Sequence, residues 1–271
     1  MFLPDNIDLK KSETYILSIR LTPNGFYFSI LCSTNTSIFY QNNIIFPSNT
    51  TYLNNIEKFI FDYSFFSYNF QKIYVICVNN EYTLTPNKYY EKRLEEDLYF
   101  FNFSNPRVKV RCNKIEQMGC KVIWGMDNSL NNFLSRTLIN PSFKIHSEVL
   151  ISYFYHLHDK SKSALYINFN DYNMIDAIAF SEEKLAFAKT FSVNSTLEGT
   201  YFIQKMWEIL KLDAQTNILF FSGRTDTYNN EIEDLKKLIP TSKNLPHALP
   251  TDLKINQYEV PTEILCQLCE L

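Results

Sequence analysis

An internal repeat is the feature that most constrains how this chain can fold. Residues 14–46 and 163–193 share one order: apolar run, polar turn, apolar run, polar turn, alternating run. Each copy is followed by an amphipathic helix pattern and then by a short apolar strand pattern. Because recurrence of a whole unit indicates repeated structure, the sequence predicts two similar lobes rather than one irregular domain.

Each copy predicts the element order β-β-β-α-β-α-β-α. We expect a first lobe at residues 1–146, with an inserted helix and strand pair at about 83–127. We expect a crossing helix within residues 147–162 and a second lobe at 163–271.

Turn and cap residues set the predicted ends of several elements. The Pro23-Asn24-Gly25 turn is expected to use positive φ at Asn-Gly. Asn49 is expected to cap a helix, in which the apolar residues at helical spacing are Leu53, Ile56, Phe59, Ile60 and Tyr63.

Two further helices are predicted from their start signals. Thr85 as cap and Pro86 at the first helical position predict a charged helix over residues 86–101. Ser195 and Glu198 form a capping-box pattern that opens a helix ending near residue 211. The residues expected on the inner face of that second helix are Leu197, Tyr201, Met206 and Leu210.

Composition excludes some classes of protein. The formal charge of −3 gives no electrostatic footprint for nucleic acid. No apolar run approaches the roughly 18 residues of a membrane-spanning helix, so membrane insertion is not expected. The start, MFLPDNIDLKKSE, lacks the apolar core of a signal peptide, which predicts a cytoplasmic protein with reduced cysteines.

Three segments carry a resemblance to a known family. They are TLTPNKYYEKRLEEDLYFFNF (residues 83–103), SALYINFNDYNMIDAIAFSEEKLAFAKTF (163–191) and NILFFSGRTD (217–226). Over nearly its whole length the chain resembles an uncharacterised family of Bacteroidetes proteins with the actin-like ATPase fold. The resemblance implies two duplicated, ribonuclease H-like α/β lobes joined by a crossing helix, and it implies no activity because fold does not fix function.

In active members of that superfamily, three loops hold ATP and Mg²⁺, and they depend on Asp and Gly. The corresponding stretches are residues 18–25, 168–173 and 222–224. The first has one Gly and no Asp, the second has no Gly and a bulky Tyr172, and the third has a single Gly. Since a phosphate cradle needs adjacent, accessible backbone amides, these loops predict a degenerate nucleotide site.

The residues of these vestigial loops are the candidate site residues, and none is assigned a catalytic or metal-binding role. They are Asn24, Gly25, Asn170, Asp171, Ser222, Gly223 and Asp226. Asp171 is a Mg²⁺ ligand only under an ATP-binding hypothesis and otherwise an Asx-turn residue. For Asp226 or Thr225, capping of the next helix is the favoured role.

Other reactive residues form no convincing site. Cys266 and Cys269 share one face of a predicted helix, where packing is favoured over redox chemistry. His156 and His158 point about 200° apart on a helix and make a poor chelate. His146 and His247 are isolated.

Two functional hypotheses follow. The first is a catalytically silent actin-like module, without cofactor, that contacts an unknown protein or a second copy of itself. Its candidate interface is formed by aromatic residues of the insertion, Tyr89, Tyr90, Phe100 and Phe101, which equally suit a core. The alternative is a divergent ATP-binding enzyme, an ATPase or kinase-like phosphotransferase, with Asp171 and Asp226 as its nominated acids.

Overall fold

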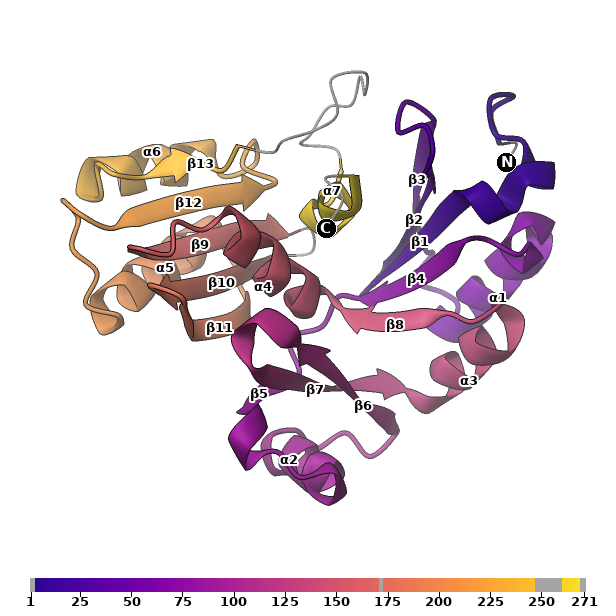
Figure 1. Ribbon diagram of the computed structural model, residues 1–271, viewed down its shortest axis with the longest axis horizontal. Helices are drawn as coiled ribbons and strands as arrows, with labels where there is room; N and C mark the ends of the chain where they lie inside the picture. The colour runs from indigo at the N-terminus through magenta and orange to yellow at the C-terminus, as the bar shows by residue number, and fades with distance from the viewer. Residues whose placement is uncertain (1–2, 171–172, 247–259, 269–271) are drawn as a thin grey trace. The chain divides into compact units, whose positions relative to one another are not determined.

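The computed structural model describes residues 3–170, 173–246 and 260–268. The described residues fall into two compact units, and the chain passes from the first to the second between His146 and Ser147. Each unit is built around a five-stranded mixed sheet (Figure 1). No helix in these described ranges is both long and apolar enough to span a bilayer.

The first unit contains the sheet β3-β2-β1-β4-β8, in which β1 pairs antiparallel with β2 and parallel with β4. Its strands are β1 (Tyr15–Thr22), β2 (Gly25–Cys32), β3 (Phe39–Ile45), β4 (Lys72–Cys77) and β8 (Ser142–Ile145). Its helices are α1 (Tyr52–Asp62) and α3 (Asn128–Thr137), with short 3-10 turns at Leu9–Thr14 and Ser64–Ser67.

An insertion between β4 and α3 adds a three-stranded antiparallel sheet in the order β5-β7-β6. It comprises β5 (Tyr82–Pro86), α2 (Glu95–Asn102), β6 (Val108–Ile115) and β7 (Cys120–Asp127), with 3-10 turns at Asn87–Tyr89, Lys92–Leu94 and Glu116–Met118.

The second unit repeats the first sheet strand for strand, in the order β11-β10-β9-β12-β13. Its elements are α4 (His146–Leu157), β9 (Ser163–Asn170), β10 (Met174–Ser181), β11 (Lys184–Ser192), α5 (Thr196–Ile209), β12 (Ile218–Gly223), α6 (Asn229–Leu238), β13 (Lys243–Asn244) and α7 (Thr262–Leu268). The last strand of the predicted order is β13, which has only two residues. The two sheets share one strand order, so the duplicated α/β fold predicted from the repeat is confirmed.

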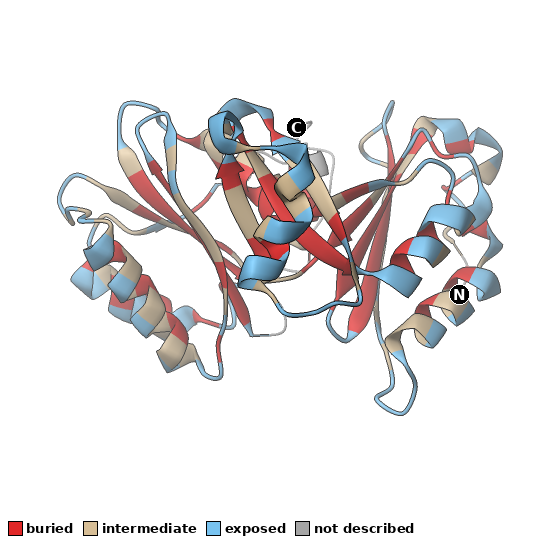
Figure 2. Cartoon of the chain, turned by 90° about the horizontal axis from the view of Figure 1, so that it is seen from below, coloured by how far each residue is buried: buried red, intermediate tan, exposed pale blue. Residues whose placement is uncertain are grey.

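Buried aromatic side chains fill much of both cores, and the central strands of each sheet are buried (Figure 2). In the first unit Phe26 and Phe28 of β2 pack against Phe59 and Phe66. In the second, Phe169 stacks on Tyr228 with ring centroids 4.3 Å apart. Since burial of one such side chain contributes about 1.5–3 kcal/mol, each unit has the means to stabilise its own fold.

The predicted helix over residues 86–101 is wrong in its first half. Thr85 pairs with Lys121 and Pro86 with Cys120, so both residues belong to β5. β5 is an edge strand, where proline is tolerated because its missing N–H need not enter a ladder. Regular α-helix begins only at Glu95.

The inner face of α5 is also different from the predicted one. Leu197 and Tyr201 are 77% and 58% exposed, whereas Gly199, Ile203 and Trp207 face the core. Met206 and Leu210 pack partly against that core, as predicted. The helix start is confirmed, because Ser195 Oγ accepts from the Glu198 amide at 3.2 Å, but the Glu198 carboxylate accepts from the amide of Asn194.

Two smaller predictions are corrected at helix and turn ends. The cap of α1 is Thr51, whose Oγ1 accepts from the Asn54 amide, and not Asn49. Neither Asn24 nor Gly25 is among the described residues with positive φ.

Candidate functional site

A buried polar cluster lies at the carboxyl ends of β9 and β12. Its centre is Asp176 of β10, whose Oδ2 accepts from Nδ2 of Asn168 at 2.9 Å and of Asn170 at 3.0 Å. Its Oδ1 accepts from Thr190 Oγ1 at 2.7 Å. All four side chains are at least nine-tenths buried. A buried carboxylate is tolerable only when it is well hydrogen-bonded, and these three donors provide that.

Asn168 extends this cluster to two other elements. Its Oδ1 accepts from Ser222 Oγ of β12 at 3.2 Å and from Thr262 Oγ1 of α7 at 2.6 Å. The side-chain amide of Asn168 therefore donates to Asp176 through its nitrogen and accepts from two hydroxyls through its oxygen. We call the six residues Asn168, Asn170, Asp176, Thr190, Ser222 and Thr262 the Asp176 network.

Gly223 closes the turn after β12 directly over β9. Its φ of 76° lies in the region that favours glycine. A Cβ here would overlap Phe169 O and come within 2.7 Å of Asn168 Oδ1. The next amide, that of Arg224, donates to Phe169 O at 2.9 Å. The close approach of this turn to β9, together with its positive φ, thus explains why residue 223 is a glycine.

The structure brings together three of the predicted site residues, Asn170, Ser222 and Gly223, around the Asp176 network. Asp171, with Tyr172, lies outside the described residues. Asp226 is about half exposed and pairs with Arg224, Nε to Oδ1 3.3 Å. The predicted capping role of Asp226 or Thr225 is wrong, because the N-cap of α6 is Tyr228 without a side-chain bond.

Asn24 and Gly25 lie in the first unit, at the predicted turn between β1 and β2. Thr22 pairs with Gly25, so the connection between β1 and β2 is only Pro23-Asn24, and residues 18–22 belong to β1. Pro23 has no N–H to offer an anion. Thr22 is 3% exposed, and its Oγ1 has no hydrogen-bond partner within the described part of the chain.

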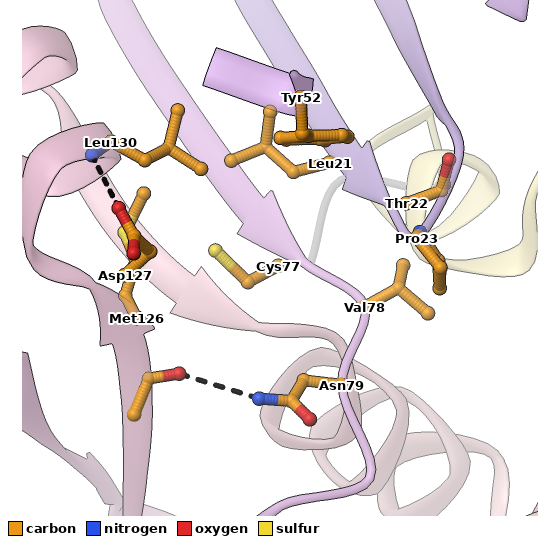
Figure 3. Close-up of a pocket in the computed structure, with 11 residues that line it drawn as sticks. Leu21, Thr22, Pro23, Tyr52, Cys77, Val78, Asn79, Met126, Asp127 and Leu130 are labelled. Carbon is orange, nitrogen blue, oxygen red and sulfur yellow. Dashed lines mark hydrogen bonds between the residues drawn. The ribbon is translucent and has the colours of Figure 1, made fainter. Parts of the chain in front are cut away.

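A pocket of about 210 Å³ lies beside this turn, within the first unit (Figure 3). The ends of β1 and β4, the stretch after β4, and residues 125–127 of β7 form its walls, together with Tyr52 of α1 and Leu130 of α3. Asn79 Nδ2 donates to Gly125 O at 3.3 Å, and the Asp127 carboxylate accepts from the Leu130 amide at 2.9 Å as the cap of α3.

The thiol of Cys77 in this wall is unreactive. Burial raises its pKa to about 12, and the nearby Arg111 guanidinium only partly offsets that effect. A thiol of so high a pKa carries almost no thiolate at neutral pH. Cys77 is therefore part of the wall and not a nucleophile.

His158 and Cys266 have packing roles, whereas His156 is exposed. His158 Nε2 contacts Glu182 O at 3.0 Å and its Nδ1 contacts Tyr166 Oη at 3.1 Å. Cys266 is buried with its Sγ on Thr262 O, and Cys269 lies outside the described residues. Within the described ranges no three His, Cys, Asp or Glu side chains are grouped to hold a metal ion.

Sequence reasoning missed Asp176, Asn168, Thr190 and Thr262. One signal was present, since Asp176 is the only charged residue in the β10 run Met174–Ser181. A charge inside an apolar strand indicates a buried partner set. Nothing local indicated Thr262, which is 94 residues from Asn168.

Comparison with known structures defines the class of protein first. A crystal structure from Bacteroides thetaiotaomicron VPI-5482, described as an actin-like ATPase fold of unknown function, superposes with a TM-score of 0.79 at 24% identity, covering 91% of this chain and 96% of that one. The PilM–PilN type IV pilus biogenesis complex gives a TM-score of 0.55 at 8% identity, covering 94% of each chain. The chain therefore has the actin-like ATPase fold.

The family follows from the sequence comparison. Residues 4–241 match the model of the family described as "Protein of unknown function (DUF3822)", and the chain belongs to that family. No functionally curated protein matches the chain.

Proposed function

We propose that this protein is a catalytically silent actin-like module that acts through protein contacts. The observation that carries the proposal is the Asp176 network. At the second-unit hairpin, where the resemblance implies a phosphate loop, Asn168 and Asn170 both donate to Asp176, and Ser222 donates to Asn168. Polar groups already paired in a buried network are costly to redirect to a ligand.

The two glycines of the candidate loops support the same proposal. The Gly223 turn gives its following amide to Phe169 O. The Gly25 turn contains Pro23 and has only two connecting residues. A phosphate cradle requires several backbone amides directed at a common point. Both turns therefore have few free amides to offer a phosphate.

Exposed aromatic side chains of the insertion favour contact with another protein. Phe101 is 88% exposed and Tyr89 66%, whereas their neighbour Tyr99 is fully buried and anchors α2. Phe100 is also exposed, and Tyr90 is half-buried beneath Lys121 Nζ at 3.4 Å. Aromatic residues are enriched at protein interfaces. One structural neighbour, the PilM–PilN pair, is itself a protein complex.

Calorimetry with Mg-ATP tests the proposal. We expect no binding up to about millimolar nucleotide, and concentration-dependent self-association or partner binding that Phe101→Asp weakens while the unfolding temperature is kept. Binding tighter than about 1 mM that is lost in Asp171→Ala would instead establish the divergent ATP-binding enzyme.

The enzyme alternative has one observation in its favour. The 210 Å³ pocket lies where β1 and β4 end, and open α/β sheets bind ligands beyond the carboxyl ends of their strands. Under this alternative ATP and Mg²⁺ are the cofactors.

A further inference from the structure

The pocket beside the β1–β2 turn has room for a small molecule. Its volume is about 210 Å³. An apolar cavity of about 150 Å³ is large enough to admit benzene. The pocket therefore accommodates one ring, or an aliphatic chain of similar size, together with a short polar arm.

Most of the pocket wall is apolar. Leu21, Val78, Met126 and Leu130 provide side chains from β1, the segment after β4, β7 and α3 (Figure 3). The neutral Cys77 thiol adds to this surface. A ligand that fits must carry an apolar body, because a fully polar one would lose its water without replacement.

The charge in the wall has one sign. Of the described residues that line the pocket, Asp127 is the sole ionisable carboxylate, and none is Lys, Arg or His. The Asp127 carboxylate uses one bond to cap α3 and has further acceptor capacity. Arg111 interacts electrostatically with Cys77 but does not line the pocket. Its guanidinium donates to Asn131 Oδ1 at 2.5 and 3.1 Å and lies 3.8 Å from the centre of the Phe143 ring.

A hydroxyl lies in the same wall. Thr22 lines the pocket, and its buried Oγ1 has no partner in the described residues. Buried hydroxyls are nearly always paired, with protein, water or ligand. Because this oxygen atom is itself buried, Thr22 is part of the wall and is assigned no bond to a ligand.

We propose that this pocket binds a small organic cation, a primary ammonium group carried on an apolar body of about one ring. The ammonium group pairs with the Asp127 carboxylate, and the body lies on Leu21, Val78, Met126 and Leu130. Phosphate and other anions are disfavoured by the same carboxylate. The proposal is independent of how the module contacts proteins.

The test uses three probes of one shape and different charge: benzylamine, benzyl alcohol and benzoate. The reporter is the ¹³C-methyl resonance of Met126, one of five methionines, assigned with Met126→Leu. We expect benzylamine to shift this resonance saturably and benzoate not to bind. Benzyl alcohol should bind about two- to fivefold more weakly than benzylamine, as expected for loss of one exposed ion pair. Equal or tighter binding of benzoate or inorganic phosphate would overturn the proposal, as would no shift with any probe at about 10 mM.

Asp127→Asn is the decisive variant, because asparagine caps helices as well as aspartate does. Its unfolding temperature should stay near that of the wild type, while its affinity for benzylamine falls to that for benzyl alcohol. Asp97→Asn is the matched control, since Asp97 lies in the first turn of α2 and does not line the pocket. Unchanged benzylamine binding in folded Asp127→Asn would refute the role of the carboxylate.

Discussion

Asp176 is a residue whose removal exposes how the second unit is held together. Its carboxylate accepts three side-chain hydrogen bonds, two from residues of β9 and one from a residue of β11. Each buried donor that loses its acceptor costs about 1–3 kcal/mol. The Asp176 carboxylate thus stabilises the second unit through hydrogen bonds, whereas the other buried residues of β10 do so through apolar packing.

We predict that Asp176→Ala lowers the free energy of unfolding by roughly 3–5 kcal/mol, because two amides and one hydroxyl lose their acceptor. Urea unfolding followed by circular dichroism measures the change. Asp226→Asn is the control: it affects an exposed pair and should change stability by no more than about 0.5 kcal/mol. Similar losses for the two variants would contradict the network.

His158 makes stability depend on pH. Glu182 O can only accept, so Nε2 carries a proton and donates to it. In the neutral ring Nδ1 is then the acceptor for Tyr166 Oη. Burial lowers the pKa of His158 below its usual 6.5. The unfolded chain therefore takes up a proton more readily, and stability is lost as the pH falls through about 6.5 toward the lower folded-state pKa.

The expected loss has a maximum slope of about 1.4 kcal/mol per pH unit for this single group. Urea unfolding at pH 7.5 and 5.5 measures it, and His158→Gln should show a shallower dependence between these values. Equal slopes in the two proteins would exclude His158 as the source.

At the level of elements, α5 shows what sequence patterns do and do not contain. The cap at Ser195 was predictable because it depends on residues three positions apart. The buried face of α5 was not predictable, because its close contact with β10 is made at a glycine, which an apolar pattern does not mark. A Cβ at Gly199 would overlap Ile175 Cδ1 of β10. The same limit applies to β5, which is a strand because it pairs with β7 and not because of its own composition.

A pair of alanine substitutions separates the two faces of α5. Ile203→Ala should destabilise by about 2–5 kcal/mol, because Ile203 is 2% exposed, and Leu197→Ala by no more than about 0.5 kcal/mol. Chemical denaturation of both variants measures the difference. A larger loss for Leu197→Ala would restore the face predicted from the sequence.

For the whole molecule, the repeat predicted two similar α/β lobes, since apolar periodicity determines which residues can form core strands. The order of strands within each sheet came only from the structure. The site was predictable only in part. Asn170, Ser222 and Gly223 do come together, but Asn170 is bound there by Asp176 of a neighbouring strand. Ser222 is bound by Asn168, whose other hydroxyl donor, Thr262, lies 94 residues further along the chain.

The silent-module proposal also predicts thermal behaviour. A ligand at one hundred times its dissociation constant stabilises the native state by about 2.7 kcal/mol, so 5 mM Mg-ATP would measurably raise the unfolding temperature if it bound with a dissociation constant near 50 μM. We expect no change in differential scanning fluorimetry. A rise of several degrees would favour the ATP-binding enzyme.

The bond from Thr262 to Asn168 has a consequence for how the protein is made. β9 is synthesised 94 residues before its partner in α7, an interval of about 5–19 s at 5–20 residues per second. During that time the carbonyl oxygen of the Asn168 side chain lacks one of its two final donors. The Asp176 network is therefore completed only after residue 262 has been synthesised, and a chain truncated before that residue lacks the Thr262 donor to Asn168.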